Sequence, residues 1–268
     1  MSQNILVDDL APGVRRITLN RPASYNAFLD SMYVELLDLF TGIGRDPSVR
    51  VVVLTGAGNG FCSGRDTVNQ EPTNWVPSGV GDRHYSLHYA AGIGAIPVAI
   101  RNLPQPVIAA VNGAAAGYGY TLALACDLVV AAKSAKFVNA FHNALTGSEA
   151  GLSYLLPRAI GTQRAAELLL TARSVTAEEA ERIGMILRAV PDEKLIDTAL
   201  ELADAIKDNA PLDIWLTKQA FYQNLNAGGL EQAIAFENLA IAAAIKTDDA
   251  QEKQASRREK RKPVFRNK

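Results

Sequence analysis

The sequence predicts an α/β fold with buried strands, and three observations support this prediction. Apolar strand, glycine-rich turn and helix follow one another repeatedly in the first two thirds of the chain. The strand segments include continuous β-branched runs, which are typical of strands buried on both faces. From residue 177 onward, apolar residues recur at helical spacing. With 268 residues, 48% of them hydrophobic, the chain can form one large domain, with or without a small appendage.

The first repeat predicts a strand–helix–strand unit. Residues 14–20, VRRITLN, alternate as in a strand, and residues 49–56, VRVVVLTG, form a β-branched run that ends in glycine. Between them, residues 28–46 carry apolar side chains at helical spacing. We therefore expect two strands joined by one helix.

The second repeat has the same order of elements. Residues 106–113, PVIAAVNG, predict a strand that leads into a turn, and GYGY at 117–120 opens an apolar helix. Two short strands are expected at 128–132 and 135–140. Before this repeat, residues 69–81 are rich in proline, glycine and polar residues and predict a mobile loop.

The C-terminal part is predicted to be helical. Thr176 and Glu179 have the spacing of a capping box, and helical patterns continue to residue 246. We therefore predict a core over residues 1–200 and a helical region over residues 201–268.

Composition indicates a soluble cytoplasmic protein. The formal net charge is −1, which gives no reason to expect nucleic acid or a charged membrane as a partner. No uninterrupted apolar run reaches the roughly 18 residues of a membrane span, and the first residues do not resemble a signal peptide. The two cysteines, Cys62 and Cys126, lie in a chain too large to need a disulfide. We expect a reducing compartment.

Two strands end in glycine-rich turns that are able to carry chemistry. The turns are VVVLTGAGNGFCSGRD at 51–66 and PVIAAVNGAAAGYGY at 106–120. Each is able to direct a backbone N–H, and the second lies at a helix N-terminus, which favours negative charge. Two converging N–H groups would form an oxyanion hole. One such turn alone is more often a packing device.

Taken together, the motifs resemble the enoyl-CoA hydratase/isomerase (crotonase) superfamily. They occur in the same order as in that family: NRPASYNAF, FCSGRD, AAAGYGYTLALACD, NAFHNALTGSEAGLSYLLPRAIG, TAEEAERIGMI and EKRKPVF. The resemblance implies a spiral of strand–strand–helix repeats, a helical C-terminal trimerisation region, and a homotrimer or homohexamer. It also implies an acyl-CoA thioester as substrate, with coenzyme A as part of that substrate, and no metal or separate cofactor.

The resemblance assigns two backbone amides to the thioester oxygen. They belong to Arg65, which follows Gly64, and to Tyr118, the middle residue of the usual three glycines. Only the amide of Tyr118 is needed, so its side chain is free to point away or to form a wall of the acyl pocket. The Arg65 guanidinium either faces solvent or meets a polar acyl group.

For coenzyme A, the resemblance implies a second set of contacts. Ala27, Ser63 and Asp66 match positions near the adenine, mostly through backbone groups. Lys260 matches a lysine that approaches the phosphates, often from a neighbouring subunit.

The acid and base groups depart from those of the best-known relatives. Hydratases of this family use two glutamates, whose positions are occupied here by Thr121 and Phe141. Neither side chain takes a proton from water at neutral pH, so two-glutamate hydration is disfavoured. Glu149 matches the catalytic carboxylate of some Δ3,Δ2-enoyl-CoA isomerases and of 4-chlorobenzoyl-CoA dehalogenases, in which an aromatic residue at the Phe141 position helps to enclose the substrate.

We therefore predict an enzyme of fatty acid metabolism that moves a double bond, with Glu149 as its single acid and base. The alternatives are a dehalogenase, a hydrolase of a C–C or thioester bond, an atypical hydratase, and a non-catalytic acyl-CoA-binding or RNA-associated relative. His84, His88 and His142 lie either on the surface or near the acyl pocket, and Cys62 is expected to be a small buried residue.

Overall fold

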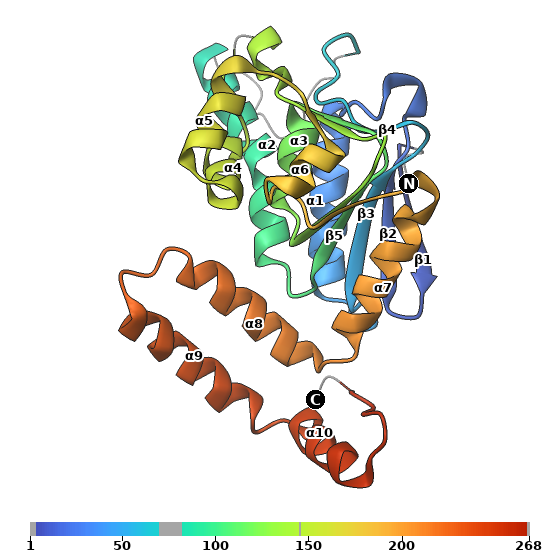
Figure 1. Ribbon diagram of the computed structural model, residues 1–268, viewed down its shortest axis with the longest axis vertical. Helices are drawn as coiled ribbons and strands as arrows, with labels where there is room; N and C mark the ends of the chain where they lie inside the picture. Colours follow the sequence, from blue (N-terminus) through green and yellow to red (C-terminus); the bar gives the residue numbers. More distant parts are fainter. Residues whose placement is uncertain (1–3, 70–81, 145, 267–268) are drawn as a thin grey trace.

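The structure is a computed structural model that describes residues 4–69, 82–144 and 146–266 (Figure 1). The side chains of residues 82–91, 143 and 144 are not described. Nearly all of the loop predicted at 69–81 therefore lies outside the described residues. The α/β prediction is confirmed, because the chain combines two mostly parallel sheets with helices.

The larger sheet has the strand order β1-β2-β3-β5-β7-β10, and the smaller sheet has the order β4-β6-β8-β9. Within the described residues, only the pairs β1–β2 and β8–β9 are antiparallel. The strands are β1 (Ile5–Ala11), β2 (Val14–Leu19), β3 (Val51–Gly56), β4 (Gly60–Cys62), β5 (Val107–Val111), β6 (Ala114–Ala116), β7 (Leu128–Ala132), β8 (Lys136–Val138), β9 (Val175–Thr176) and β10 (Arg188–Val190).

The order of elements confirms the predicted spiral. A strand of the larger sheet, a short strand of the smaller sheet and a helix follow one another as β3-β4-α2, β5-β6-α3 and β7-β8-α4. The helices are α1 (Asp30–Gly44), α2 (Asp82–Asn102), α3 (Tyr118–Ala125), α4 (Leu152–Ile160), α5 (Thr162–Thr171), α6 (Ala177–Arg182), α7 (Leu195–Lys207), α8 (Pro211–Asn224), α9 (Leu230–Ala244) and α10 (Asp248–Glu259).

The core explains the continuous apolar strands. All five residues of β5 are buried, and so are the first five of β3. Helices cover both faces of this sheet: α1, α2 and α3 lie on one side and α7 on the other (Figure 1). A parallel sheet covered in this way needs apolar residues on both faces.

The C-terminal helices α8, α9 and α10 extend away from the sheet as an arm (Figure 1). The predicted boundary at residue 200 falls inside α7, which packs against β3, β5 and β7. The division into core and helical region stays a prediction. The capping box is present in part, because the Thr176 hydroxyl accepts a hydrogen bond from the Glu179 N–H at 3.2 Å.

Candidate active site

The two glycine-rich turns lie against each other. Gly64 has a φ of 103°, which an L side chain rarely adopts. A Cβ placed on Gly64 would lie 3.2 Å from the Ala116 carbonyl oxygen and 3.5 Å from the Tyr118 nitrogen. The left-handed φ, together with the tight contact to Ala116, therefore favours glycine at position 64.

The first turn is held by a short parallel β-bridge between Phe28 and Arg65. The Phe28 N–H donates to the Gly64 carbonyl at 2.8 Å, and the Asp66 N–H donates to the Phe28 carbonyl at 2.8 Å. Successive N–H groups of an extended strand point to opposite sides. The Arg65 N–H is therefore directed away from Phe28.

The second turn opens α3. Gly117 has a φ of 51°, and its carbonyl accepts from the N–H groups of Tyr120 and Thr121 at 3.0 and 3.3 Å. The Tyr118 amide is the first of the helix, where the partial positive charge of the helix dipole is concentrated. Both predicted amide donors therefore belong to turns that are in direct contact.

Phe141 lies beside these turns. It belongs to a 3₁₀ helix at Ala140–Ala144 and is 4% exposed. A Cβ on Gly117 would lie 3.8 Å from the Phe141 ring and 3.9 Å from the Gly64 Cα. The edge of the Phe141 ring thus lies next to the turns. In the family that the sequence resembles, hydratases have a glutamate at this position.

Glu149 lies against the first turn of α3. The Thr121 hydroxyl donates to the Glu149 carbonyl at 3.3 Å, and Thr121 is the fourth residue of that helix. Left-handed φ angles occur on both sides of Glu149, at Gly147 (68°), Ala150 (52°) and Gly151 (97°). The angle at Ala150 costs about 1 kcal/mol or more for a residue with a Cβ, and such strain occurs often at functional sites.

The Tyr118 ring packs in the core between α3 and α1. It is 2% exposed, and its centroid lies 4.8 Å from that of Tyr33 and 5.2 Å from that of Phe28, both in edge-on geometry. Pairs of this kind add about 0.5–1.5 kcal/mol beyond the area they bury. A tyrosine is therefore accommodated in the turn because its ring has a place in the core.

The Arg65 side chain also has a partner within the chain. Its Nε lies 3.7 Å from an oxygen of Asp30, whose side chain is only 3% exposed. Asp30 is in the first turn of α1, where the helix dipole favours a carboxylate. The guanidinium is thus directed towards α1.

The residues predicted to contact adenine lie on two adjacent segments. The Ser63 N–H donates to the Tyr25 carbonyl at 2.9 Å, and its hydroxyl donates to the Ser24 carbonyl at 3.1 Å. Ala27 lies on the same segment as Tyr25 and is 7% exposed. The structure therefore brings Ala27 and Ser63 together.

Arg21, a residue that the sequence prediction missed, joins Asp66 to the segment that contains Ala27. Arg21 donates to the Ala27 carbonyl and, at 2.8 Å, to the Asp66 carboxylate. Burial alone would raise the pKa of Asp66, but hydrogen bonds from Asn69, Arg21 and Val68 together hold it well below its usual range. This carboxylate organises the turn, and the arginine in the NRP motif was the available signal.

Two other predicted groups lie elsewhere. Lys260 follows α10, at the opposite end of the molecule from α3 (Figure 1). The His142 ring nitrogen Nε2 lies 2.7 Å from the Leu169 carbonyl on α5. The side chains of His84 and His88 lie outside the described residues.

Cys62 is fully buried, as expected, and burial raises the pKa of its thiol to about 12. The thiolate is therefore scarce at neutral pH. Within the described residues, no cluster of three metal-binding side chains occurs. Among the same residues, no helix is long and apolar enough to cross a membrane.

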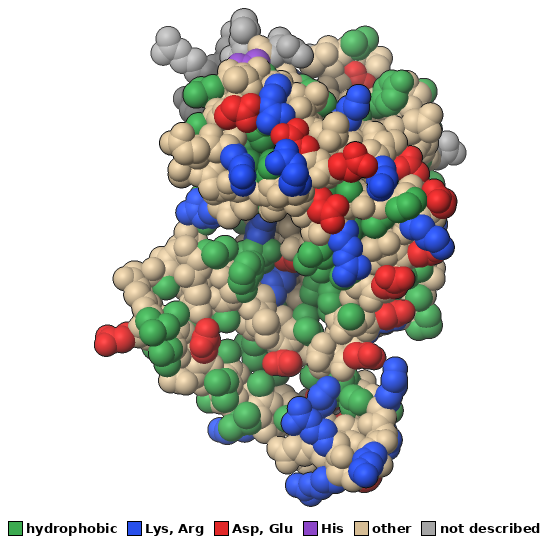
Figure 2. All heavy atoms as spheres, viewed as in Figure 1, with side chains coloured by type: hydrophobic (Ala, Val, Ile, Leu, Met, Phe, Trp, Pro, Cys, Tyr) green, Lys and Arg blue, Asp and Glu red, His purple; other side chains and the backbone are tan. Residues whose placement is uncertain are grey.

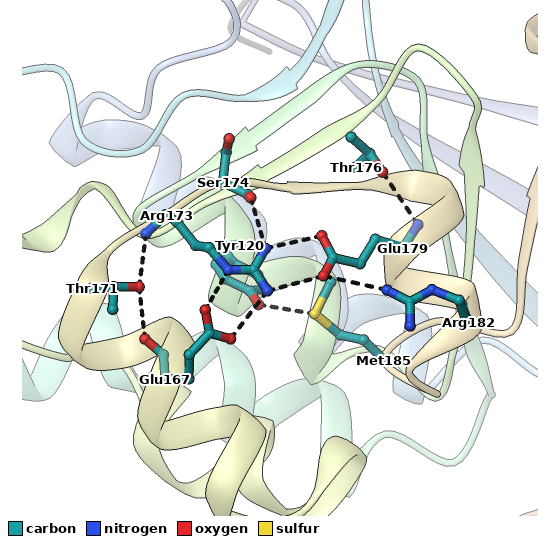
Figure 3. Close-up of polar contacts among 9 residues, drawn as sticks. All are labelled: Tyr120, Glu167, Thr171, Arg173, Ser174, Thr176, Glu179, Arg182 and Met185. Carbon is teal, nitrogen blue, oxygen red and sulfur yellow. Dashed lines mark hydrogen bonds and ion pairs between the residues drawn. The ribbon is translucent and has the colours of Figure 1, made fainter.

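Two sets of polar contacts that the sequence prediction missed lie close to α3 (Figure 3). The Tyr120 hydroxyl donates to the Met185 sulfur at 2.9 Å, which ties the first turn of α3 to the segment after α6. Nearby, the Arg173 guanidinium binds the carboxylates of Glu167 and Glu179. Hydrogen bonds from Arg173 lower the pKa of both glutamates, so both stay ionised and hold α5 to α6.

Comparison with known proteins identifies relatives along the whole chain. The sequence model of the family described as Enoyl-CoA hydratase/isomerase matches residues 9–268. A probable enoyl-CoA hydratase of Mycobacterium bovis is 44% identical over 263 residues, which cover 97% of this chain and 92% of that protein. The 1,2-epoxyphenylacetyl-CoA isomerase of Escherichia coli is 41% identical over 221 residues, 80% of each chain.

A solved structure confirms the predicted crotonase-type fold. The crystal structure of a probable enoyl-CoA hydratase/isomerase from Mycobacterium abscessus matches with a TM-score of 0.90 at 40% identity. The match covers 98% of this chain and 99% of that one.

Proposed function

Because the chain belongs to the enoyl-CoA hydratase/isomerase family and is an enzyme of that family, we propose that it isomerises the double bond of an enoyl-CoA thioester. The main support is the hydrogen bond from the Thr121 hydroxyl to the Glu149 carbonyl. Thr121 occupies the position of the first hydratase glutamate, and this hydrogen bond joins it to the turn that carries the Glu149 carboxylate. Glu149 is then the single acid and base beside the two amide donors.

The proposed reaction needs no water and no oxidant. The thioester oxygen lies between the N–H groups of Arg65 and Tyr118. Glu149 takes a proton from Cα, and the electron pair moves through the double bond system to the thioester oxygen as a dienolate. The same carboxyl group returns the proton to Cγ, so the double bond moves from the β,γ to the α,β position. Each amide donor contributes on the order of 2.7–4 kcal/mol to stabilising such an oxyanion.

Substitution of Glu149 tests this role. In Glu149→Gln the carboxylate is lost while the side chain keeps its size, and we expect turnover of 3-enoyl-CoA to fall about 10²–10⁴-fold. The affinity for a CoA ligand should stay within a few-fold of wild type, because the amide donors are unchanged. Glu201→Gln, an exposed acid on α7, is the matched control and should keep full turnover. Unchanged activity in Glu149→Gln would rule out the proposed acid and base.

Hydration is the second candidate, because the relative at 44% identity is named a probable hydratase. In that case Glu149 acts as a lone base on water. The reaction in ¹⁸O-water separates the two: isomerisation leaves the product unlabelled, whereas hydration or hydrolysis places solvent oxygen in it. A panel of enoyl-, aryl- and cyclic acyl-CoA thioesters provides the substrates for this measurement.

Assembly into a homotrimer or homohexamer is part of the proposal. Large apolar side chains of α9 are exposed, among them Leu230 at 77%, Leu239 at 73% and Ile241 at 56%. Burial of such a surface by another copy is favourable. A neighbouring copy would also be able to bring Lys260 to the coenzyme A phosphates. Light scattering measures the mass, and a monomer at micromolar concentration would contradict the assembly.

A further inference from the structure

The first turn of α1 contacts both residues that carry the amide donors. An oxygen of the Asp30 carboxylate lies 3.7 Å from the Arg65 Nε. On the same turn, the Tyr33 ring packs edge-on against the Tyr118 ring, with the centroids 4.8 Å apart. Asp30 and Tyr33 are both buried. One helical turn therefore contacts the two donor residues through their side chains.

The peptide group that carries the Arg65 N–H is restrained from the same side. This N–H shares a planar peptide group with the Gly64 carbonyl and points in the opposite direction. The carbonyl accepts a hydrogen bond at 2.8 Å from the N–H of Phe28, which lies just before α1. Glycine has more conformational freedom than other residues. The orientation of the amide therefore depends on the contacts that restrain Gly64 and Arg65.

The ion pair between Asp30 and Arg65 is the side-chain part of this restraint. The Asp30 side chain is only 3% exposed and the Arg65 side chain 33% exposed. A pair that is partly shielded from water is screened less by salt than a pair on the surface. The pair keeps the Arg65 guanidinium against α1, so residue 65 is held by its side chain as well as by its backbone.

We propose that Asp30 is a positioning residue for the oxyanion hole. Its carboxylate holds the Arg65 side chain against α1 and thereby keeps the Arg65 N–H directed at the thioester oxygen. Because Tyr33 packs against Tyr118 from the same helical turn, one helix sets the separation of the two amides. The inference rests on the oxyanion hole of the proposed function, but it does not depend on Glu149 being the acid and base.

The effect of the two amides on a bound carbonyl is measurable without turnover. The chromophore para-dimethylaminocinnamoyl-CoA absorbs at longer wavelength when its thioester oxygen accepts strong hydrogen bonds, and we expect such a red shift on binding to the wild-type protein. Asp30→Asn keeps the side-chain volume and removes the charge. It should lose about half of the red shift or more, with the affinity for the chromophore within about threefold of wild type. Asp38→Asn, at an exposed position of the same helix, is the matched control and should keep the full shift.

Turnover provides a second readout. The negative charge on the thioester oxygen develops in the transition state, so a displaced donor lowers kcat more than it raises KM. Asp30→Asn should lower kcat for 3-enoyl-CoA about tenfold to a hundredfold, because complete loss of a donor costs about 10²–10³. KM should stay within about threefold of wild type. A substitution that only loosened the fold would lower the amount of folded protein and leave the red shift of each folded molecule unchanged.

Variants of Arg65 determine whether Asp30 acts through this residue. Arg65→Met keeps the backbone N–H and should lose as much of the red shift as Asp30→Asn does. The double variant should lose no more than either single variant, because both remove the same interaction. Arg65→Lys keeps the charge and should retain more of the shift than Arg65→Met. Since the Arg65 side chain is 33% exposed, these variants should fold even where Asp30→Asn does not.

The outcomes separate this inference from the proposed function. A full red shift in Asp30→Asn or Arg65→Met, or additive losses in the double variant, would overturn the positioning role alone. Binding of the chromophore to wild type without a red shift would overturn both the amide donors and the role of Asp30. If Glu149→Gln keeps full turnover while Asp30→Asn loses the shift, the acid and base assignment is wrong and the positioning role is confirmed.

Discussion

The helices α3 and α9 are both rich in apolar residues, but their surroundings are opposite. All eight residues of α3 are buried, beneath the turn that supplies the Tyr118 amide. No residue of Leu230–Ala244, all of which are described, is buried in α9, and Figure 2 shows hydrophobic side chains gathered on the arm. An apolar helical pattern therefore predicts a helix but not what covers it. For α3 the same chain provides the cover, and for α9 we expect another copy to do so.

The largest effect is expected where α3 meets β4. A Cβ on Gly119 would lie 2.1 Å from the Cys62 carbonyl oxygen, which is backbone and unable to move cheaply. Gly119→Ala should lower the free energy of unfolding by about 3 kcal/mol or more, measured by urea denaturation. At Gly42, on α1, a Cβ would meet nothing within 4 Å. Gly42→Ala should instead stabilise by about 0.5–1 kcal/mol. Equal effects at the two positions would contradict the close contact.

The next effect compares leucines on the two helices. Leu122 on α3 is fully buried, so Leu122→Ala should cost about 2–5 kcal/mol of unfolding free energy. Leu239 on α9 is 73% exposed, and Leu239→Ala should cost less than about 0.5 kcal/mol when the protein is dilute enough to be monomeric. Repeating the denaturation at rising protein concentration sharpens the comparison. If the loss of unfolding free energy caused by Leu239→Ala grows with protein concentration, another copy of the chain covers α9.

The smallest effect compares two carboxylates, one near the site and one on the arm. The pKa of Asp66 is lowered in the folded state from a model-peptide value of 3.8, so its ionised form stabilises the fold at higher pH. This contribution should be lost as the pH falls below about 4, through the lowered pKa. Asp66→Asn should therefore flatten the acid side of a stability curve measured from pH 6 to 2.

Glu252 on α10 is the control for this measurement. Its pKa is lowered to about 2, first by the side-chain hydrogen bond from Arg261. Both side chains of this pair are partly exposed, and solvent screens such pairs. Glu252→Gln should leave the acid limb almost unchanged. A larger change for Glu252→Gln than for Asp66→Asn would contradict the expectation that the less exposed carboxylate, Asp66, is the one whose hydrogen bonds stabilise the fold more.

Local patterns predicted most of the α/β core. β2 and β7 lie within the residues expected for them, because their apolar runs report directly on burial. β1 was not predicted, since ILVDDLA has two acids in its middle. It is an edge strand, and Asp8 and Asp9 pair with Arg16 and Arg15 of β2. Such a strand depends on its neighbour more than on its own pattern.

By itself, the sequence determined the two glycine turns, the helix after the second turn and the absence of a carboxylate at Thr121, because backbone conformation and side-chain chemistry are local properties. Only the tertiary structure decided which distant groups meet. Arg21 reaches Asp66 across 45 residues, and Lys218 reaches Asp127 across 91. These pairs form because folding brings their segments together, and burial then requires each charge to find a partner. The spacing of residues along the chain does not predict which of these distant charged groups come into contact.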